Sequence, residues 1–356
     1  MKTVFAIVGT RPEAIKMYPV IKELKNSNLN TVVIHTGQHK DMLDIHIKEL
    51  DITVDVYLDA VGSTMVEVMN SIVANLEIQV QKYNPHCIIA QGDTNSVYAA
   101  ASVSFYNQIP FAHIEAGLRS GDINSPFPEE MNRILSDRLS SMMFCPTKEA
   151  VQNLLNEGLD ENNIFLVGNT VVDAIIEMTQ GVQINNDNSF NILTTMHRRE
   201  NHGANLVKFC KALKELAQND KIKILFPVHQ NPDVWNVVHN ELASISNITL
   251  TKPMEYKSFL HAMVNADLIL TDSGGVQEEV ATLGKKAFIL RKNTERKEAL
   301  NTNIQMLGNE TNDIVDKVKT FYNSYKKPLL NTIKYHYIFG DGDSSKKIVN
   351  IIKETI

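Results

Sequence analysis

Short apolar runs that alternate with helix-patterned segments constrain the fold of this chain more than any other feature. In the first half these runs are rich in β-branched and aliphatic residues, and they cover 3–8, 31–36, 87–91, 110–114, 141–145 and 164–167. The second half repeats the plan at 191–196, 222–228, 248–251, 267–271, 287–291 and 304–307. Such alternation predicts a parallel sheet that is wound on both faces by helices. We therefore expect two similar α/β units.

Length and linker composition agree with two domains. At 356 residues the chain exceeds the usual size of one domain, about 150 residues. The segment TQGVQINNDNSF at 179–190 is polar and rich in Asn and Gly, as interdomain linkers are. We expect a first domain at 1–178, a second at 179–342 and a hinge at 179–190. The C-terminal segment 343–356 is expected to form an amphipathic helix with Ser344 as its cap, packed on either domain.

Charge, apolar runs and cysteines exclude several classes of protein. A formal net charge of −6 argues against a nucleic-acid-binding protein or an anionic membrane surface as partner. The N-terminal apolar run TVFAIV is cut off at Gly9, and nothing approaches the roughly 18 apolar residues of a membrane span, so a cytoplasmic protein is expected. The cysteines Cys87, Cys145 and Cys210 are widely spaced and predict neither a disulfide framework nor a zinc site.

Polar residues gather where the expected strands end. In an open parallel sheet, ligands bind outside the carboxyl ends of the strands. The segments at those ends are GTRPE (9–13), TGQH (36–39), QGDT (91–94), HIEAGLRS (113–120), MHRREN (196–201), PVHQNP (227–232) and TDSGGVQEE (271–279). Both units therefore carry polar strand ends that suit a binding site.

The segment DSGGVQEE is the best phosphate cradle in the chain. Neither G-x-G-x-x-G nor a P-loop motif occurs. Ser273, Gly274 and Gly275 end a strand and open a helix, so their backbone N–H groups and the helix dipole suit a diphosphate. The alternative is a tight turn that needs glycine for its backbone angles. Glu278 and Glu279 follow in the first turns of this helix. One interpretation is that both complement the helix dipole, and the other is that one of them accepts hydrogen bonds from ribose hydroxyls.

Cationic groups stand beside two other strand ends. MHRREN places His197 and Arg198 directly after a strand, where a guanidinium can bind phosphate and an imidazole can donate a proton. Solvation at the surface is the alternative for one of the two arginines of this segment. Arg11 lies beside the helix start at Pro12, which offers a second site for a negative group.

The acids of the first half indicate acid and base chemistry. Asp93, Glu115 and Glu129 come from neighbouring strand ends and the following loop, and several carboxylates in one place have pKa values that are pushed apart. Glu129 has a structural alternative, because Pro128 is typical of a helix start and acids are favoured in the first turn. Arg133, four residues after Glu129, is a candidate partner for it.

A metal site is the main rival use of these side chains. His113 and Glu115, with Asp93, His197 and His229, could form a divalent-metal hydrolase site. The chain has no H-E-x-x-H and no compact ligand spacing, so we favour a site without a metal.

Nine motifs in one order carry a resemblance. They are GTRPEAIK, GQH, QGDT, HIEAGLRS, PEEMNR, GNTVVDA, HRREN, PVHQNP and DSGGVQEE, and FGDGDSS at 339–345 gives a weaker match. The chain resembles the non-hydrolysing UDP-N-acetylglucosamine 2-epimerases from residue 4 to about 300. The resemblance implies two Rossmann-like doubly wound domains in a GT-B arrangement, with the active site in the interdomain cleft. It also implies a C-terminal helix that crosses back to the first domain, and usually a homodimer.

The reaction that this resemblance implies is the reversible conversion of UDP-GlcNAc to UDP-ManNAc, which supplies precursors for cell-surface polysaccharide. The C2 proton of the sugar is not next to a carbonyl, so direct abstraction is very difficult. Elimination of UDP gives a glycal, and re-addition from the other face inverts C2. This path needs a diphosphate cradle and carboxylates near C2, but no metal or nicotinamide cofactor.

The resemblance also implies roles for individual residues. Those that match the family's catalytic positions are Asp93, Glu115, Glu129 and His197. Those that match its UDP contacts are Arg11, Lys16, Phe259, Ser273, Gly274, Gly275, Glu279 and Arg296. Those that match an allosteric substrate site are Gln38, Glu130, Arg198 and His229. Relatives place an arginine in the stretch that corresponds to 59–66, and this chain has none there.

Three other functions stay open on sequence alone. The first is the same 2-epimerase chemistry on another UDP-2-acetamido sugar, and the second is a GT-B glycosyltransferase, which needs an acceptor cleft. The third is a non-catalytic nucleotide-sugar-binding protein. Three carboxylates in the first domain favour the epimerase over the glycosyltransferase.

Overall fold

The computed structural model describes residues 1–356 apart from 39, 186, 199–200, 292–298, 301, 309 and 328–331, and for 40–42 it describes the backbone alone. The chain divides into two compact units, Met1–Ala174 with Phe339–Ile356, and Ile175–Ile338. The first division falls inside the helix α7 (Thr170–Thr179), slightly before the expected bound at 178. The linker expected at 179–190 thus begins where α7 ends.

The first unit is a seven-stranded parallel sheet in the order β3-β2-β1-β4-β5-β6-β7. Its strands are β1 (Thr3–Val8), β2 (Asn30–His35), β3 (Val56–Tyr57), β4 (Cys87–Gln91), β5 (Phe111–Ile114), β6 (Met142–Cys145) and β7 (Ile164–Leu166). Its helices are α1 (Arg11–Asn26), α2 (Lys40–Glu49), α3 (Met65–Tyr83), α4 (Asn95–Tyr106), α5 (Glu129–Leu139), α6 (Lys148–Asn156), the 3₁₀ turn η1 (Glu161–Asn163), α7 up to the division, and α13 (Ser344–Thr355). The strand order reverses between β1 and β4, which is where such sheets bind ligands.

Central strands of this sheet are apolar and wholly buried, as expected of a parallel sheet covered on both faces. Ile72 and Leu76 of α3 and Val97 of α4 join the strand residues Phe5 and Ile88 in one core cluster. Burying such side chains stabilises the fold by about 1.5 to 3 kcal/mol each. The three cysteines are buried and form no disulfide, as their spacing predicts.

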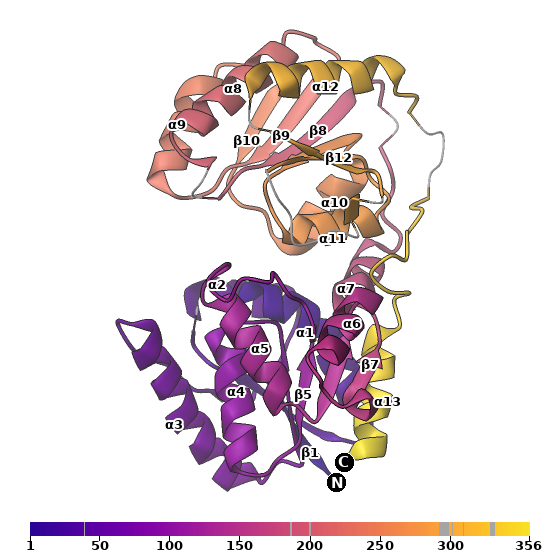
Figure 1. Ribbon diagram of the computed structural model, residues 1–356. Helices are drawn as coiled ribbons and strands as arrows, with labels where there is room; N and C mark the ends of the chain where they lie inside the picture. The colour runs from indigo at the N-terminus through magenta and orange to yellow at the C-terminus, as the bar shows by residue number, and fades with distance from the viewer. Residues whose placement is uncertain are drawn as a thin grey trace. The chain divides into compact units, whose positions relative to one another are not determined.

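The second unit repeats the design with a six-stranded parallel sheet in the order β10-β9-β8-β11-β12-β13. Its strands are β8 (Phe190–Thr195), β9 (Ile222–Pro227), β10 (Ile248–Thr251), β11 (Leu268–Thr271), β12 (Ala287–Leu290) and β13 (Ile304–Leu307). Its helices are the rest of α7, α8 (Ala204–Leu216), α9 (Pro232–Leu242), α10 (Tyr256–Asn265), α11 (Gly275–Thr282) and α12 (Thr311–Ser324). Helices α8 and α12 lie together beside the sheet (Figure 1). The strand order reverses between β8 and β11.

The expected strands are confirmed in both units, to within a residue or two at their ends. Sequence reasoning missed β3, because this edge strand has two residues and exposes Tyr57. Too few residues alternate there to give a strand pattern. No helix in the described part of the chain is both long enough and apolar enough to cross a membrane.

The C-terminal helix α13 belongs to the first unit and packs on α1, and Figure 1 draws it in yellow. The expected cap Ser344 is wrong, because Ser344 is the first helical residue and Asp343 is the N-cap. Asp343 makes no capping hydrogen bond with its side chain. Instead the Asp173 carboxylate of α7 accepts from the backbone N–H of Ser344 at 3.3 Å and of Ser345 at 2.8 Å. A carboxylate from another helix therefore satisfies this N-terminus.

Candidate active site

The turn after β1 is built around the side chain of Glu13. The backbone N–H groups of Gly9 and Thr10 donate to Glu13 Oε2 at 2.6 and 3.2 Å. Gly9 has to be glycine, because a Cβ there would lie 2.1 Å from Ser96 Oγ. Burial raises the pKa of Glu13 to about 7, although these hydrogen bonds favour the ionised form. Next to this turn Arg11 begins α1 and has no ion-pair partner among the described residues.

Glu115 lies just after β5 and is 7% exposed. Its two carboxylate oxygens lie 2.7 and 2.8 Å from Lys16 Nζ, and Gln91 Nε2 donates to Glu115 Oε2. The backbone φ of Glu115 is +70°, a conformation that non-glycine residues keep where the surrounding structure holds it, often at functional sites. The structure thus brings the predicted UDP contact Lys16 against the predicted catalytic Glu115.

Asp93 follows β4 and is bound by Arg133 of α5. Arg133 Nε and Nη2 donate to Asp93 Oδ2 at 3.0 and 2.6 Å, and Arg133 Nη1 donates to Glu130 Oε2 at 2.9 Å. The alternative in which Arg133 pairs with Glu129 is therefore wrong. The turn after β4 lies against α5, so that the guanidinium meets Asp93 and leaves Glu129 for other contacts.

Glu129 is the first residue of α5, and Pro128, expected to be first, is its N-cap. Glu129 Oε2 is buried and has no hydrogen-bond partner in the described structure. A buried acceptor without a partner costs about 1 to 3 kcal/mol, and in a native protein such an atom calls for an explanation, for example a catalytic role or a bound water. This oxygen is the strongest local support for a ligand-facing role of Glu129.

Two residues of the predicted allosteric set lie in the first unit, and both have partners within the fold. Gln38 Oε1 accepts from Ser96 N at 3.0 Å and from Ser96 Oγ at 2.6 Å. Glu130 Oε1 accepts from the backbone N–H of Ser120 at 2.8 Å and of Gly121 at 3.2 Å. These bonds hold the loops beside the predicted acids.

In the second unit, the fully buried Asp272 ties together two strand ends. It follows β11, and it accepts from Arg198 N at 3.0 Å and Asn201 Nδ2 at 2.8 Å, while His197 Nδ1 lies 3.0 Å from its Oδ1. Burial by itself raises the pKa of Asp272, but the bonds from His197, Asn201 and the Arg198 backbone hold the pKa below its usual value. Sequence reasoning missed this residue, although an aspartate directly after a strand was a usable signal.

The glycine turn after Asp272, predicted to be a phosphate cradle, leads directly into α11. Gly274 is the N-cap of α11 and Gly275 its first residue. A Cβ built on Gly275 would meet nothing within 4 Å, so a ligand can approach this backbone closely. The predicted contacts Phe259 on α10 and Glu279 on α11 are both buried. The predicted contact Arg296 lies outside the described residues.

His229 follows β9 and lies near His197. Partial burial and the nearby His197 and His202 lower the pKa of His229. Its Nδ1 accepts from the backbone N–H of Asn231 at 3.1 Å. His229 is therefore uncharged at neutral pH, and it belongs to the same strand-end surface as His197.

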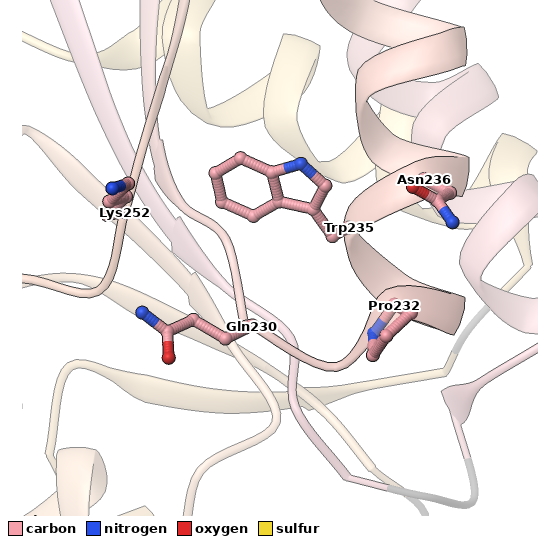
Figure 2. A pocket seen from close by; sticks show the side chains of 5 residues that line it. All are labelled: Gln230, Pro232, Trp235, Asn236 and Lys252. Carbon is pink, nitrogen blue, oxygen red and sulfur yellow. The ribbon is translucent and has the colours of Figure 1, made fainter.

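A separate pocket of about 320 Å³ opens beside the segments that follow β9 and β10. Figure 2 shows its lining residues, Gln230, Pro232, Trp235, Asn236 and Lys252. The indole of Trp235 is stacked on His239, with ring centroids 4.0 Å apart. None of the predicted site residues that the structure describes lines this pocket.

The metal site considered above finds no support in the geometry of His113. Its Nδ1 lies 2.6 Å from Asp137 Oδ1 and its Nε2 lies 2.7 Å from the Gly92 carbonyl oxygen, so neither nitrogen is available as a ligand. Over the part of the chain that the structure describes, no three His, Cys, Asp or Glu side chains are grouped to hold a metal ion.

Comparison with known proteins decides the family. A sequence profile of the UDP-N-acetylglucosamine 2-epimerase family matches residues 22–353. The chain belongs to this family. A UDP-N-acetylglucosamine 2-epimerase from Yersinia pestis is 37% identical over an alignment that covers 98% of both chains.

Solved structures agree with this assignment. The crystal structure of UDP-GlcNAc 2-epimerase from Neisseria meningitidis bound to UDP-GlcNAc is 36% identical, with a TM-score of 0.87 over 100% of both chains. The enzyme from Methanocaldococcus jannaschii, in complex with UDP-GlcNAc and UDP, is 35% identical, with a TM-score of 0.81 over 99% of this chain and 100% of that one. The resemblance is thus confirmed, and with it the isomerase class and the fold class of two Rossmann-like domains of the GT-B type.

Proposed function

We propose that the chain interconverts UDP-GlcNAc and UDP-ManNAc by reversible epimerisation at C2 of the sugar. Family membership supports this activity, and the relatives from Neisseria meningitidis and Methanocaldococcus jannaschii were crystallised with UDP-GlcNAc. The observation in this chain that carries the proposal is the set of carboxylates Asp93, Glu115 and Glu129 after β4, after β5 and at the start of α5. Such a set suits proton transfer at a carbon that carries no acidifying carbonyl.

The proposed reaction begins with elimination. A carboxylate of the first unit takes the C2 proton, the C1–O bond to UDP breaks, and a C1=C2 double bond forms. UDP then adds back to C1 while a proton is delivered to C2 from the opposite face. Asp93, Glu115 and Glu129 share these acid and base roles, and His197 assists at the diphosphate.

UDP is proposed to bind mainly to the second unit. Ser273 and Gly274 lead into α11, and a Cβ on its first residue, Gly275, would meet nothing within 4 Å, which suits a diphosphate. His197 and Arg11 add donors that stabilise the charge developing on the leaving group. Phe259 is proposed to lie near the uracil, and Glu279 near the ribose. Lys16 is proposed to contact UDP from its place beside Glu115, and Arg296 is proposed as a further contact.

Incubation of UDP-GlcNAc with the protein in deuterated water tests this proposal by proton NMR. We expect UDP-ManNAc signals, with deuterium at C2 of both sugars, because the abstracted proton exchanges with solvent. A non-catalytic sensor would bind UDP-GlcNAc and leave C2 protonated. An epimerase for another UDP-2-acetamido sugar would leave UDP-GlcNAc unchanged and deuterate its own substrate, and a glycosyltransferase would release UDP only when an acceptor is added.

The expected homodimer is also a proposal. Phe105 and Tyr106 at the end of α4 are 61% and 84% exposed, and Ile78 of α3 is 59% exposed. The hydrogen bond from Asn107 Nδ2 to Glu77 Oε2 at 2.6 Å holds these helix segments together, and exposed apolar side chains on such neighbouring segments suit contact with a second copy. Sedimentation should give a dimer for the wild type and a monomer for Phe105→Glu. A cytoplasmic location and an allosteric role for Gln38, Glu130, Arg198 and His229 stay predictions.

A further inference from the structure

His113 of β5 is completely buried and contacts two acceptors, one on each ring nitrogen. A backbone carbonyl oxygen can only accept a hydrogen bond, so Nε2, which lies 2.7 Å from the Gly92 oxygen, must carry a proton. The other nitrogen, Nδ1, lies 2.6 Å from Asp137 Oδ1. The state of the ring thus depends on whether Asp137 is ionised.

The surroundings of Asp137 favour the carboxylate. Its second oxygen, Oδ2, accepts from the backbone N–H of Gly117 at 3.1 Å and lies 2.8 Å from Arg119 Nη1. Burial raises the pKa of Asp137, but His113 and Arg119 outweigh this and hold the pKa below its usual value. An ionised Asp137 leaves the second proton on Nδ1, so the ring is an imidazolium.

The other groups near the His113 ring are also consistent with an imidazolium. Burial lowers the pKa of His113 and the Arg119 charge lowers it further, but Asp137 and the Gly92 carbonyl raise it above the usual value on balance. Burial raises the pKa of the Cys145 thiol on the next strand, so the thiol is neutral. The positive ring is therefore compensated by one carboxylate, Asp137.

The His113 ring is hydrogen-bonded to the turn after β4, which carries Asp93. Gly92 has φ +93°, and its N–H donates to the Ile114 carbonyl at 3.0 Å, so β5 binds both polar groups of this glycine. The next residue, Asp93, is bound through its carboxylate by Arg133 of α5. Asp137 lies four residues after Arg133 on the same helix. A closed chain of contacts thus joins β5, the turn after β4 and α5.

We propose that His113 is a positioning residue for Asp93, and that as an imidazolium it ties α5 to the turn after β4 so that the Asp93 carboxylate stays in place. The proposal rests on the proposed function, in which Asp93 is one of the acids and bases. Loss of the contact to Gly92 moves Asp93, and a shift of about 1 Å at a reacting group lowers turnover by about 10²-fold.

Nitrogen NMR of protein labelled with ¹⁵N-histidine tests the protonation state without any need for activity. The His113 signals are assigned by their loss in His113→Gln. We expect both ring nitrogens to show the chemical shifts of a protonated imidazolium at pH 7. A neutral ring at pH 7 would overturn the proposal.

Two amide variants test the positioning role. The glutamine amide nitrogen reaches the place of Nε2 and can still donate to Gly92, whereas the asparagine amide nitrogen reaches the place of Nδ1 and contacts Asp137 alone. We expect His113→Gln to keep kcat within about tenfold of the wild type, and His113→Asn to lose about 10²-fold, with KM for UDP-GlcNAc unchanged in both. His35→Gln, at a buried histidine on β2, is the control, with a lower Tm and an unchanged kcat.

The outcomes separate this proposal from the proposed function. If both His113 variants lose Tm and keep the same kcat per folded molecule, the residue is merely structural and the proposal is wrong. If the wild-type protein does not epimerise UDP-GlcNAc, the proposed function fails, while the NMR experiment still decides the state of the ring. If neither variant folds, the His113 signals are assigned in the wild type from ring-to-backbone correlations, and a neutral ring at pH 7 still overturns the proposal.

Discussion

The carboxyl ends of the two sheets are built in different ways. In the first unit, charged side chains are paired with one another, as in Glu115 with Lys16 and Asp93 with Arg133. In the second unit, one buried carboxylate, Asp272, binds backbone and side-chain donors of the neighbouring segment. Beside it the backbone at Gly275 faces open space.

This difference suits two kinds of chemistry. Paired side chains hold proton-carrying groups in one geometry, because a buried charge that loses its partner is costly. Backbone N–H groups at a helix start offer fixed dipoles to an anion and need no rearrangement when it binds. We infer that the first unit is organised for proton transfer and the second for holding a diphosphate.

Gly275→Asp should have the largest effect. A carboxylate at the start of α11 would occupy the space proposed for the diphosphate and repel it, which costs several kcal/mol, or about 10³-fold in Kd for UDP. Isothermal titration calorimetry measures this loss. Gly308→Asp is the matched control, because Gly308 also follows a strand of this sheet and has open space around its Cβ position. Equal UDP affinity in the Gly275 variant and the wild type would show that the cradle is elsewhere.

The acids of the first unit should affect turnover and leave binding nearly unchanged. Asp93→Asn, Glu115→Gln and Glu129→Gln should each lower kcat by about 10²-fold, the scale of a lost acid or base. The Kd for UDP should change by only a few-fold, because the proposed cradle lies in the second unit. Glu149→Gln is the control for a helix-dipole role, since Glu149 is an exposed acid in the first turn of α6. If Glu129→Gln resembles this control, Glu129 has only a helix-start role.

Glu13→Gln should change stability with pH. The pKa of Glu13 is about 7 in the folded protein and 4.5 in the reference state, so the folded state binds this proton more tightly. The stabilisation that proton binding by Glu13 gives to the folded state is complete below pH 4.5, and it is lost as the pH rises through 7. Above pH 7 the ionised side chain costs about 3 kcal/mol, which an amide avoids while it still accepts from Gly9.

Urea unfolding at pH 5 and pH 8 measures this effect. Glu13→Gln should be more stable than the wild type at pH 8, and the difference should shrink towards pH 5. The control is Glu67→Gln at the start of α3, where the same capping arrangement is exposed and the hydrogen bonds lower the pKa of Glu67. That variant should gain no stability at pH 8, and a gain of equal size in both variants would contradict the burial argument.

Asp272→Asn should weaken substrate binding moderately. The amide keeps one acceptor oxygen where the carboxylate has two, so the segment that carries His197 and Arg198 is less well held. We expect kcat/KM for UDP-GlcNAc to fall about tenfold, the effect of one lost charge-assisted hydrogen bond. Asp267→Asn is the control at the other end of β11, where a buried aspartate accepts from Asn191 and Tyr325. It should lower Tm and leave kcat/KM unchanged.

Dialysis against a chelator should have the smallest effect. The proposed mechanism neutralises the leaving diphosphate with Arg11, His197 and backbone N–H groups, so turnover should remain intact. Activity is measured before and after dialysis in metal-free buffer. Loss of turnover that one divalent ion restores would favour the metal-dependent alternative for the acids of the first unit.

The sequence by itself determined the elements and the places where they end. Apolar runs such as 87–91 and 267–271 predict burial directly, because the hydrophobicity of their own residues favours it. The glycines and acids that follow these strands mark the binding surface by position alone, and the ordered motifs identified the family. The two-residue strand β3 was not predicted, because its pairing with β2 depends on the sheet and not on the pattern of its own residues.

Only the tertiary structure decided which charged groups meet. Arg133 binds Asp93 although Glu129 stands four residues before it on the same helix. His113 is paired with Asp137, Asp272 binds the segment after β8, and Asp173 caps α13 from another helix. The partners in these contacts are between 24 and 172 positions apart. Burial forces each such group to find a partner, but local spacing carries no information about a partner that the fold brings from so far away.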